Sequence, residues 1–277
     1  MKSIFVNRDG LNIPYSKVVV DRQTKYQRLR VLETEKFGKI IVLDSIMFQA
    51  EEGDELTEMA THLPLNTGPK KRTVLLIGGG DGFALRELVK HRYLESIDLV
   101  EIDGVLLEEC KKIFTFSGAW NDPRVHIFVN DGSTVLREHA TDKYDLIIST
   151  PANTYTEHGK KNIAFSLFSK QYFRSAYNAL RGDGIFITDG STSHYSEKKP
   201  NWVSIYHDLK SIFPVVMPYF FASKRMPGGS FVLLLASKQY HPIKNFNLNQ
   251  RGLKTRYYNQ GIHVAAFSLP EFLIKKM

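Results

Sequence analysis

Three acidic residues follow apolar runs at regular places in the chain, and this spacing is the feature that most suggests chemistry. Asp81 lies in "LLIGGGDGFALRE", Glu101 ends "SIDLVE" and Asp131 follows "RVHIFVN". Glycines come directly before the first acid, at Gly78, Gly79 and Gly80. Glycines there would let a ligand approach the backbone without a Cβ in the way. The pattern predicts a ligand that passes over the glycines beside a carboxylate.

The charge of the loop limits the ligand. A pyrophosphate is anionic and would avoid Asp81, whereas the sulfonium and amine of an S-adenosylmethionine-type molecule would be attracted to it. Glu101, about 20 residues further on, could accept both hydroxyls of a ribose. Asp131 could accept the exocyclic amine of adenine, with Gly132 leaving room. The alternative is that each acid only caps the helix that follows it.

The elements around these acids alternate between strands and helices. The predicted strands cover 73–79, 96–103, 124–131, 144–150 and 184–190, and the predicted helices cover 83–91, 104–113, 133–139 and 166–181. This rhythm is typical of a doubly wound parallel α/β sheet, in which ligands bind beyond the carboxyl ends of the strands. Two later apolar runs, 214–223 and 228–237, could add an antiparallel hairpin at one edge.

The first part of the chain has a different character. Its β-type runs at 15–21, 26–34 and 38–44 predict an antiparallel sheet. A helix follows over 54–65, with Asp54 as a possible N-cap. We therefore expect a small β domain over residues 1–66 and a catalytic α/β domain over 67–277.

Composition narrows the class of protein further. The chain has 277 residues, 43% of them hydrophobic, which suffices for a real core. No apolar run approaches the roughly 20 residues of a membrane span, and a single cysteine favours the cytoplasm. The net charge of +8 comes from scattered basic residues, so a solvated surface is favoured over a nucleic-acid partner. No His and Cys spacing suggests a metal site.

With these residues placed, the chain resembles the spermidine synthase family, the polyamine aminopropyltransferases. The motifs are "LLIGGGDGFALRE", "VEID", "DPRVHIFVNDG", "YDLII", the N-terminal "YQRLRVLETEKFGKIIVLDSIMFQ" and the C-terminal "TRYYNQGIHVAAFSLPEF". The resemblance implies a small N-terminal β domain, a Rossmann-like catalytic domain, and a homodimer or homotetramer. It also implies decarboxylated S-adenosylmethionine as donor and a polyamine or other amine as acceptor.

Carried over by position, the resemblance assigns the donor contacts to Gln27, Asp81, Glu101, Asp131 and Gly132, and it suggests that Gln49 lines the same pocket.

The acceptor half of the site departs from the family pattern. The family base, an Asp at the end of the fourth strand, is replaced by Thr150, and a second acid is replaced by Asn153. Neither side chain can act as a general base near neutral pH. Asp189, at the end of the adjacent strand, is the best replacement. An aromatic acceptor-side motif reads "MPGGSF" (226–231), and a Tyr-containing pair before Glu58 is absent.

The acidic stretch 51–58 has two interpretations, a surface that attracts a cationic acceptor and a solvated helix start.

Four functions remain open from the sequence. The first is an aminopropyltransferase with a modified acceptor pocket. The second is an S-adenosylmethionine-dependent N-methyltransferase, and the third is a catalytically impaired, nucleoside-binding paralogue. A nucleic-acid modifier, suggested only by the basic charge, is the weakest.

Overall fold

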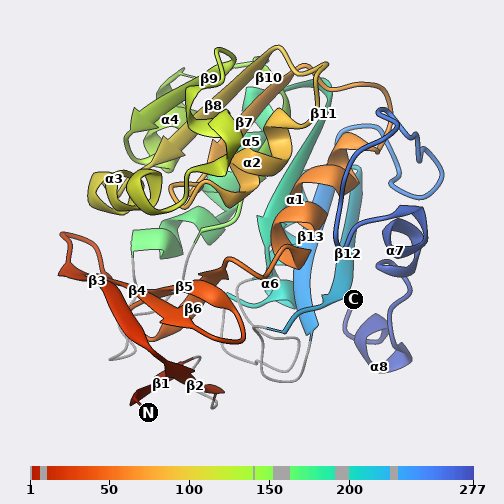
Figure 1. The fold of residues 1–277 in the computed structure, drawn as a ribbon. Helices are drawn as coiled ribbons and strands as arrows, with labels where there is room; N and C mark the ends of the chain where they lie inside the picture. The colour runs from red at the N-terminus through yellow and green to blue at the C-terminus, as the bar shows by residue number, and fades with distance from the viewer. Residues whose placement is uncertain (1, 7–10, 140, 152–162, 191–199, 225–229) are drawn as a thin grey trace.

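The apolar runs after residue 72 form one seven-stranded sheet. The computed structural model describes residues 2–6, 11–139, 141–151, 163–190, 200–224 and 230–277, and orders the strands β12-β13-β11-β10-β7-β8-β9 (Figure 1). The strands are β7 (Thr73–Ile77), β8 (Ser96–Glu101), β9 (Val125–Val129), β10 (Tyr144–Ser149), β11 (Leu180–Asp189), β12 (Val215–Ala222) and β13 (Ser230–Ser237). The first five run parallel, and β13 pairs antiparallel with β11 and β12. The predicted parallel sheet and its antiparallel edge hairpin are therefore confirmed.

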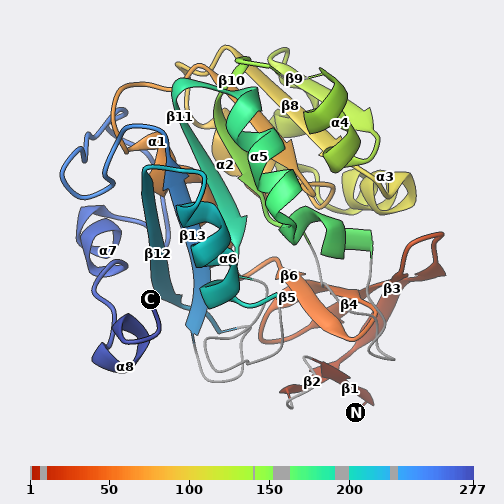
Figure 2. The ribbon, with the colours of Figure 1, turned by 180° about the vertical axis from the view of Figure 1, so that it is seen from behind.

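Helices cover both faces of this sheet. On one face lie α1 (Glu55–Leu65) and α2 (Phe83–Val89), and on the other lie α4 (Gly132–His139), α5 (Lys170–Ala179) and α6 (Trp202–Lys210) (Figures 1 and 2). Because successive side chains of a strand point to opposite faces, Leu76 packs with the first set of helices and Leu75 with the second. This arrangement is the doubly wound, Rossmann-like architecture.

The strand order changes direction at β7. The chain proceeds from β7 to β8 and β9 on one side, and then returns to place β10 and β11 on the other side. Loops after β7 and β10 therefore diverge, which leaves a crevice at the carboxyl ends of these strands.

The N-terminal segment forms separate antiparallel sheets. A hairpin of β1 (Lys2–Val6) and β2 (Leu11–Tyr15) is followed by a four-stranded sheet of β3 (Lys17–Gln23), β4 (Arg28–Thr34), β5 (Gly38–Leu43) and β6 (Ile46–Ala50). Apolar residues on one face of this sheet, among them Leu29 and Ile41, pack against Phe83 of α2 and Leu106 of α3 (Gly104–Ile113). The small sheet thus lies beside the crevice, while the predicted domain boundary at residue 66 stays a prediction.

Two segments differ from the sequence-based expectation. The predicted helix over 166–181 is a 3₁₀ turn, η2 (Ile163–Phe168), followed by the shorter α5. The strand after it starts at Leu180 rather than at residue 184, because Leu180 pairs with Tyr144 of β10. Further elements were not expected from the sequence: the hairpin β1–β2, β6, a second 3₁₀ turn η1 (Phe116–Asn121), α6, and the C-terminal helices α7 (Gln260–Ala265) and α8 (Glu271–Ile274).

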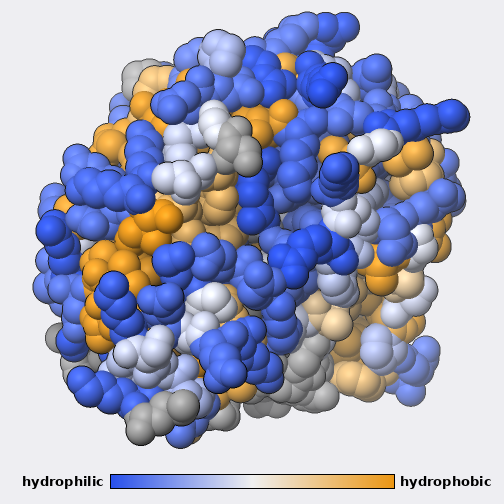
Figure 3. Space-filling model, viewed as in Figure 1, coloured by the Kyte–Doolittle hydropathy of each residue, from blue (hydrophilic) through white to orange (hydrophobic). Residues whose placement is uncertain are grey.

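Most of the face that carries α1 and α2 is hydrophilic, and apolar side chains on it gather between α3 and the N-terminal sheet (Figure 3). None of the helices in the described part of the chain is long and apolar enough to cross a membrane.

Candidate active site

The glycine loop after β7 makes a turn that requires glycine at two points. Gly78 has φ 79°, in the left-handed region, and its backbone N–H donates to Val100 O of β8. A Cβ on Gly80 would lie 2.6 Å from Cγ of Glu101. The loop therefore passes directly over the end of β8, and the Glu101 side chain fills the space where a Cβ of Gly80 would lie, while the predicted approach of a ligand to the glycines stays a prediction.

Glu101 is the buried acid at the end of β8. Its Oε2 accepts a hydrogen bond from the Gly80 backbone N–H (3.1 Å), and its Oε1 accepts one from the Asp103 N–H (2.9 Å). Burial raises the pKa of Glu101 from 4.5 to about 7; the two backbone donors lower it, and the carboxylates of Asp103 and Asp81 raise it. A polar ligand that donates to this carboxylate would complete its environment.

Asp81 and Asp131 both hold the backbone that follows them. Asp81 Oδ1 accepts from the Phe83 N–H (2.7 Å), and Asp131 Oδ1 accepts from the Ser133 N–H (2.7 Å) and hydroxyl (2.7 Å). Asp131 therefore caps α4, whereas Asp81 lies one residue before Gly82, the N-cap of α2, and accepts from the first N–H of that helix. Capping does not exclude a ligand, because Asp131 also lines the cavity described next.

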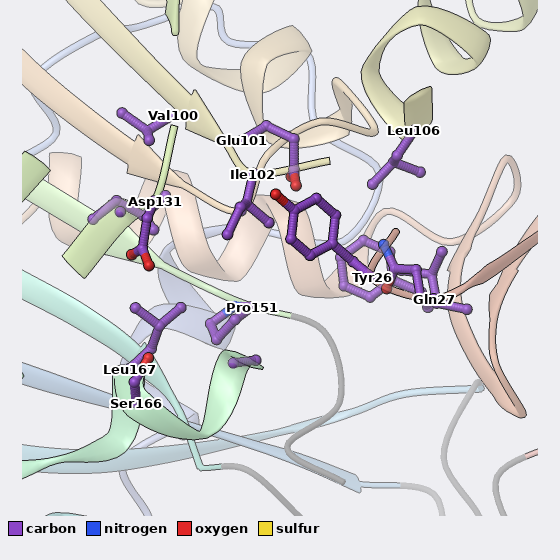
Figure 4. A pocket seen from close by; sticks show the side chains of 16 residues that line it. Tyr26, Gln27, Val100, Glu101, Ile102, Leu106, Asp131, Pro151, Ser166 and Leu167 are labelled. Carbon is purple, nitrogen blue, oxygen red and sulfur yellow. The ribbon is translucent and has the colours of Figure 1, made fainter. Parts of the chain in front are cut away.

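A cavity lies over the carboxyl ends of β7, β8 and β9. About 680 Å³ of space there is free of protein atoms, and part of it is open to solvent. The residues that line it are Tyr26, Gln27, Leu43, Phe48, Ile77, Gly78, Val100, Glu101, Ile102, Leu106, Asp131, Gly132, Pro151, Ala164, Ser166 and Leu167. In Figure 4 the carboxylates of Glu101 and Asp131 point toward the side of the cavity that carries Pro151, Ser166 and Leu167. The cavity is thus apolar, with two acids on one wall.

The structure brings together some of the sequence-predicted donor residues. Five of them line the cavity: Gln27, Gly78, Glu101, Asp131 and Gly132. Among the described residues, those that do not line it are Gln49, Gly79, Gly80 and Asp81. Gly80 and Asp81 lie beside Glu101, since one donates to its carboxylate and the other raises its pKa. Gln49 is buried in β6, where its Oε1 accepts from the Ala50 N–H (3.1 Å). The roles of all these residues stay predictions.

The apolar walls were not predicted. Ile102, Pro151 and Leu167 come from three separated segments, and Tyr26 comes from the N-terminal sheet. The only sequence signal for two of these residues was that they adjoin predicted site residues, since Tyr26 precedes Gln27 and Ile102 follows Glu101.

On the acceptor side, Thr150 and Asp189 end neighbouring strands. Ser149 of β10 pairs with Thr188 of β11, so Thr150, directly after β10, and Asp189, the last residue of β11, lie at the same end of neighbouring strands. Thr150 is buried and Asp189 is partly exposed. Neither is among the described residues that line the cavity. Asn153, and residues 226–229 of the "MPGGSF" segment, lie outside the described residues.

The interpretation of the acidic stretch 51–58 as a solvated helix start is wrong for the acids of α1, whereas its attraction for a cationic acceptor stays a prediction. Glu55 and Glu58 are buried rather than solvated. Glu55 Oε1 accepts from the Ser223 hydroxyl (3.1 Å), and Glu58 accepts from the backbone N–H groups of residues 256–258. These carboxylates hold other parts of the chain.

Asp54 precedes α1, but its side chain caps no backbone N–H. Instead it pairs with Arg86 and, at 3.0 Å, with Arg256. Within the described ranges, no group of three or more His, Cys, Asp or Glu side chains could hold a metal ion.

The sheet, its switch point and the cavity at the strand ends define a Rossmann-like α/β protein with the fold of S-adenosylmethionine-dependent transferases. Residues 54–247 match the spermine/spermidine synthase domain, and residues 7–52 match the spermidine synthase tetramerisation domain. The chain belongs to the spermidine synthase family.

Relatives and solved structures agree with this assignment. The chain is 33% identical to a polyamine aminopropyltransferase of Clostridium beijerinckii, over 95% of this chain and 92% of the relative. It is 35% identical to one of Moorella thermoacetica, over 95% and 91%. A spermidine synthase in complex with the transition-state analogue AdoDATO superimposes with a TM-score of 0.88 at 29% identity, covering 99% of this chain and 92% of that one. The spermidine synthase of Thermotoga maritima gives 0.87 at 29% identity, with the same coverage.

Proposed function

We propose that this protein transfers an aminopropyl group from decarboxylated S-adenosylmethionine to an amine such as putrescine. The observation that carries the proposal is the single cavity that joins Glu101, Asp131 and the glycine loop, in a chain of the spermidine synthase family. The comparisons do not favour a methyltransferase, a nucleic-acid modifier or a non-enzymatic paralogue.

In this proposal the donor half of the site binds the nucleoside. Glu101 accepts the ribose hydroxyls and Asp131 the adenine amine, with Ile102, Pro151 and Leu167 against the base. Asp81 attracts the cationic tail. The other donor contacts are Gln27, Gln49, Gly78, Gly79, Gly80 and Gly132. Support comes from the cavity that Gln27, Gly78, Glu101, Asp131 and Gly132 line, and from Gly80 and Asp81 beside Glu101.

The chemical step is a displacement at the carbon next to the sulfonium. The amine nitrogen forms a bond to that carbon, the carbon–sulfur bond breaks, and its electron pair stays on sulfur as a thioether. The amine must lose a proton, yet a free alkylamine has a pKa near 10. We assign the proton to Asp189, because Thr150 in the neighbouring position has no basic group. Holding the two reactants together supplies a further large part of the rate.

The proposal is tested with the purified chain, both forms of the donor and a panel of amines. We expect methylthioadenosine and an aminopropylated amine with decarboxylated S-adenosylmethionine, and no methylated amine with S-adenosylmethionine. Asp189→Asn is expected to lower kcat by about 10²–10⁴. Asp183→Asn, on the same strand at its opposite end, is the matched control. Failure of every amine to react, with an active relative as positive control, would refute the proposal.

Assembly and location complete the proposal. The match of residues 7–52 to the tetramerisation domain supports an oligomer, which we propose is a homotetramer, with a homodimer as the alternative. Exposed apolar side chains on the N-terminal sheets, Phe5 and Val18, would be covered in such an assembly. Light scattering on the purified chain tests this, and a monomer would contradict it. Location in the cytoplasm, expected from the single cysteine, stays a prediction.

A further inference from the structure

Asp103 uses both oxygens of its carboxylate to join two distant segments of the chain. It lies two residues after Glu101 and is 1% exposed. Its Oδ1 accepts from the backbone N–H groups of Val105 (3.2 Å) and Leu106 (3.3 Å), which caps α3. Its Oδ2 accepts from side chains of the turn between β3 and β4, residues 24–27.

The carboxylate makes one short, buried contact and one longer, partly buried contact to this turn. The Thr24 hydroxyl donates to Asp103 Oδ2 at 2.7 Å, and Gln27 Nε2 donates to the same oxygen at 3.1 Å. The Thr24 hydroxyl also accepts from the backbone N–H groups of Tyr26 (3.0 Å) and Gln27 (3.1 Å). One hydroxyl therefore shapes the turn and ties it to Asp103.

The same residue is joined to Glu101, which also lines the cavity. The Asp103 N–H donates to Glu101 Oε1, and Glu101 Oε2 accepts from the Gly80 N–H. A continuous set of hydrogen bonds thus runs from the turn 24–27, through Asp103 and Glu101, to the glycine loop. Tyr26, Gln27 and Glu101 all line the cavity, whereas Asp103 does not.

We propose that Asp103 is a positioning residue for nucleoside binding. It fixes Tyr26 and Gln27 of the N-terminal sheet at a set position relative to Glu101 of the catalytic domain. The proposal rests on the proposed function, because it assigns the nucleoside of the donor to this cavity. A wall built from two segments must be held in register before a ligand arrives, since ordering it during binding would weaken affinity.

Asp103→Asn separates the two tasks of this side chain. An Asn oxygen can still cap α3, but its amide nitrogen then faces the Thr24 hydroxyl, whose proton loses its acceptor, and the Gln27 amide must rotate to present its oxygen instead. Thr24→Val removes the hydroxyl with little change in shape, and Thr24→Ser keeps it.

Thr34→Val is the matched control. The Thr34 hydroxyl accepts from the Phe37 N–H at 3.0 Å and donates to Gly38 O at 2.8 Å, in a comparable buried turn of the same sheet that does not line the cavity. This variant loses a buried hydroxyl without disturbing the link to Asp103.

The test measures KM for the donor, kcat at saturating donor, and methylthioadenosine binding by calorimetry, all on the full chain. Asp103→Asn and Thr24→Val are expected to raise KM and Kd about tenfold, or about 1.4 kcal/mol, with kcat changed less than about threefold. Thr24→Ser is expected to restore both values, and Thr34→Val to leave them unchanged.

Two different failures can be told apart. The positioning role would be overturned if Asp103→Asn and Thr24→Val both kept the KM and Kd of the wild-type protein. It would also be overturned if Thr34→Val raised these values as much as they do. Either result would leave the proposed function standing. A wild-type protein that neither binds methylthioadenosine nor transfers an aminopropyl group would overturn both.

Discussion

Glu101 gives the sharpest test of the site, because its ionisation ties stability and ligand binding to pH. Burial raises its pKa from 4.5 to about 7. In this window the folded protein holds a proton that the unfolded chain has released, so folding stability falls as pH rises from about 4.5 to 7. The shift of about 2.5 units corresponds to about 3 kcal/mol. We calculate that about 2.5 kcal/mol of this falls between pH 5 and pH 8.

Glu101→Gln removes this dependence, since an amide does not titrate. We expect the free energy of unfolding of the variant, relative to wild type, to increase by about 2–3 kcal/mol between pH 5 and pH 8. Urea unfolding of both proteins without ligand measures it. Glu108→Gln, at an exposed position on the helix that follows, controls for the change in net charge.

The affinity for the ligand is expected to rise with pH, whereas the folding stability falls. In the proposed function the ionised carboxylate accepts both ribose hydroxyls, and with a pKa of about 7 its ionised fraction rises from about one tenth at pH 6 to about nine tenths at pH 8. Methylthioadenosine should therefore bind wild type about tenfold more tightly at pH 8 than at pH 6. Calorimetry on Glu101→Gln should show weak binding without this slope. A wild-type affinity independent of pH, or an equal slope in the variant, would refute the reasoning.

Three further predictions concern the loop, the C-terminal segment and the cysteine. Gly80→Ala should weaken methylthioadenosine binding at least tenfold, because the added Cβ would lie 2.6 Å from Glu101 Cγ, and unchanged affinity in calorimetry would contradict this. Glu58→Gln should lower the free energy of unfolding by about 2 kcal/mol, because an amide has one oxygen for the three N–H groups of residues 256–258. Urea unfolding measures this loss, and a loss smaller than that caused by Glu→Gln at an exposed position would contradict the prediction. Cys110 should react with a thiol reagent only after unfolding, since it is fully buried and burial raises the pKa of its thiol well above the usual value. Rapid labelling of the native protein would contradict this prediction.

The sheet could be predicted because its signal is local. Strands buried on both faces appear as apolar runs, and β7, β8 and β10 end within two residues of the predicted positions. The start of β11 could not be predicted, since Arg181 and Gly182 are exposed and only the pairing of Leu180 with Tyr144 extends the strand. Such a boundary depends on a partner strand more than 30 residues away.

The site residues at the ends of the strands could be predicted from the sequence, and those that depend on distant contacts could not. Glu101 and Asp131 end adjacent parallel strands, so topology alone brings them to one edge, and both line the cavity. Tyr26 and the contact between Thr24 and Asp103 depend on how the N-terminal sheet docks, across 79 residues of sequence. The burial of Glu58 could not be predicted from the sequence either, because a charged residue at a helix start usually faces water.

The three hydrogen bonds of Glu58 link the beginning of the chain to its end, across 198 to 200 residues. During synthesis the N-terminal part leaves the ribosome first, and α1 then carries a carboxylate whose backbone donors have not yet been made. Burying that charge alone would be costly. Final packing of α1 must therefore wait until almost the whole polypeptide has emerged, so nascent chains and products truncated before residue 256 would be natural clients of chaperones and proteases.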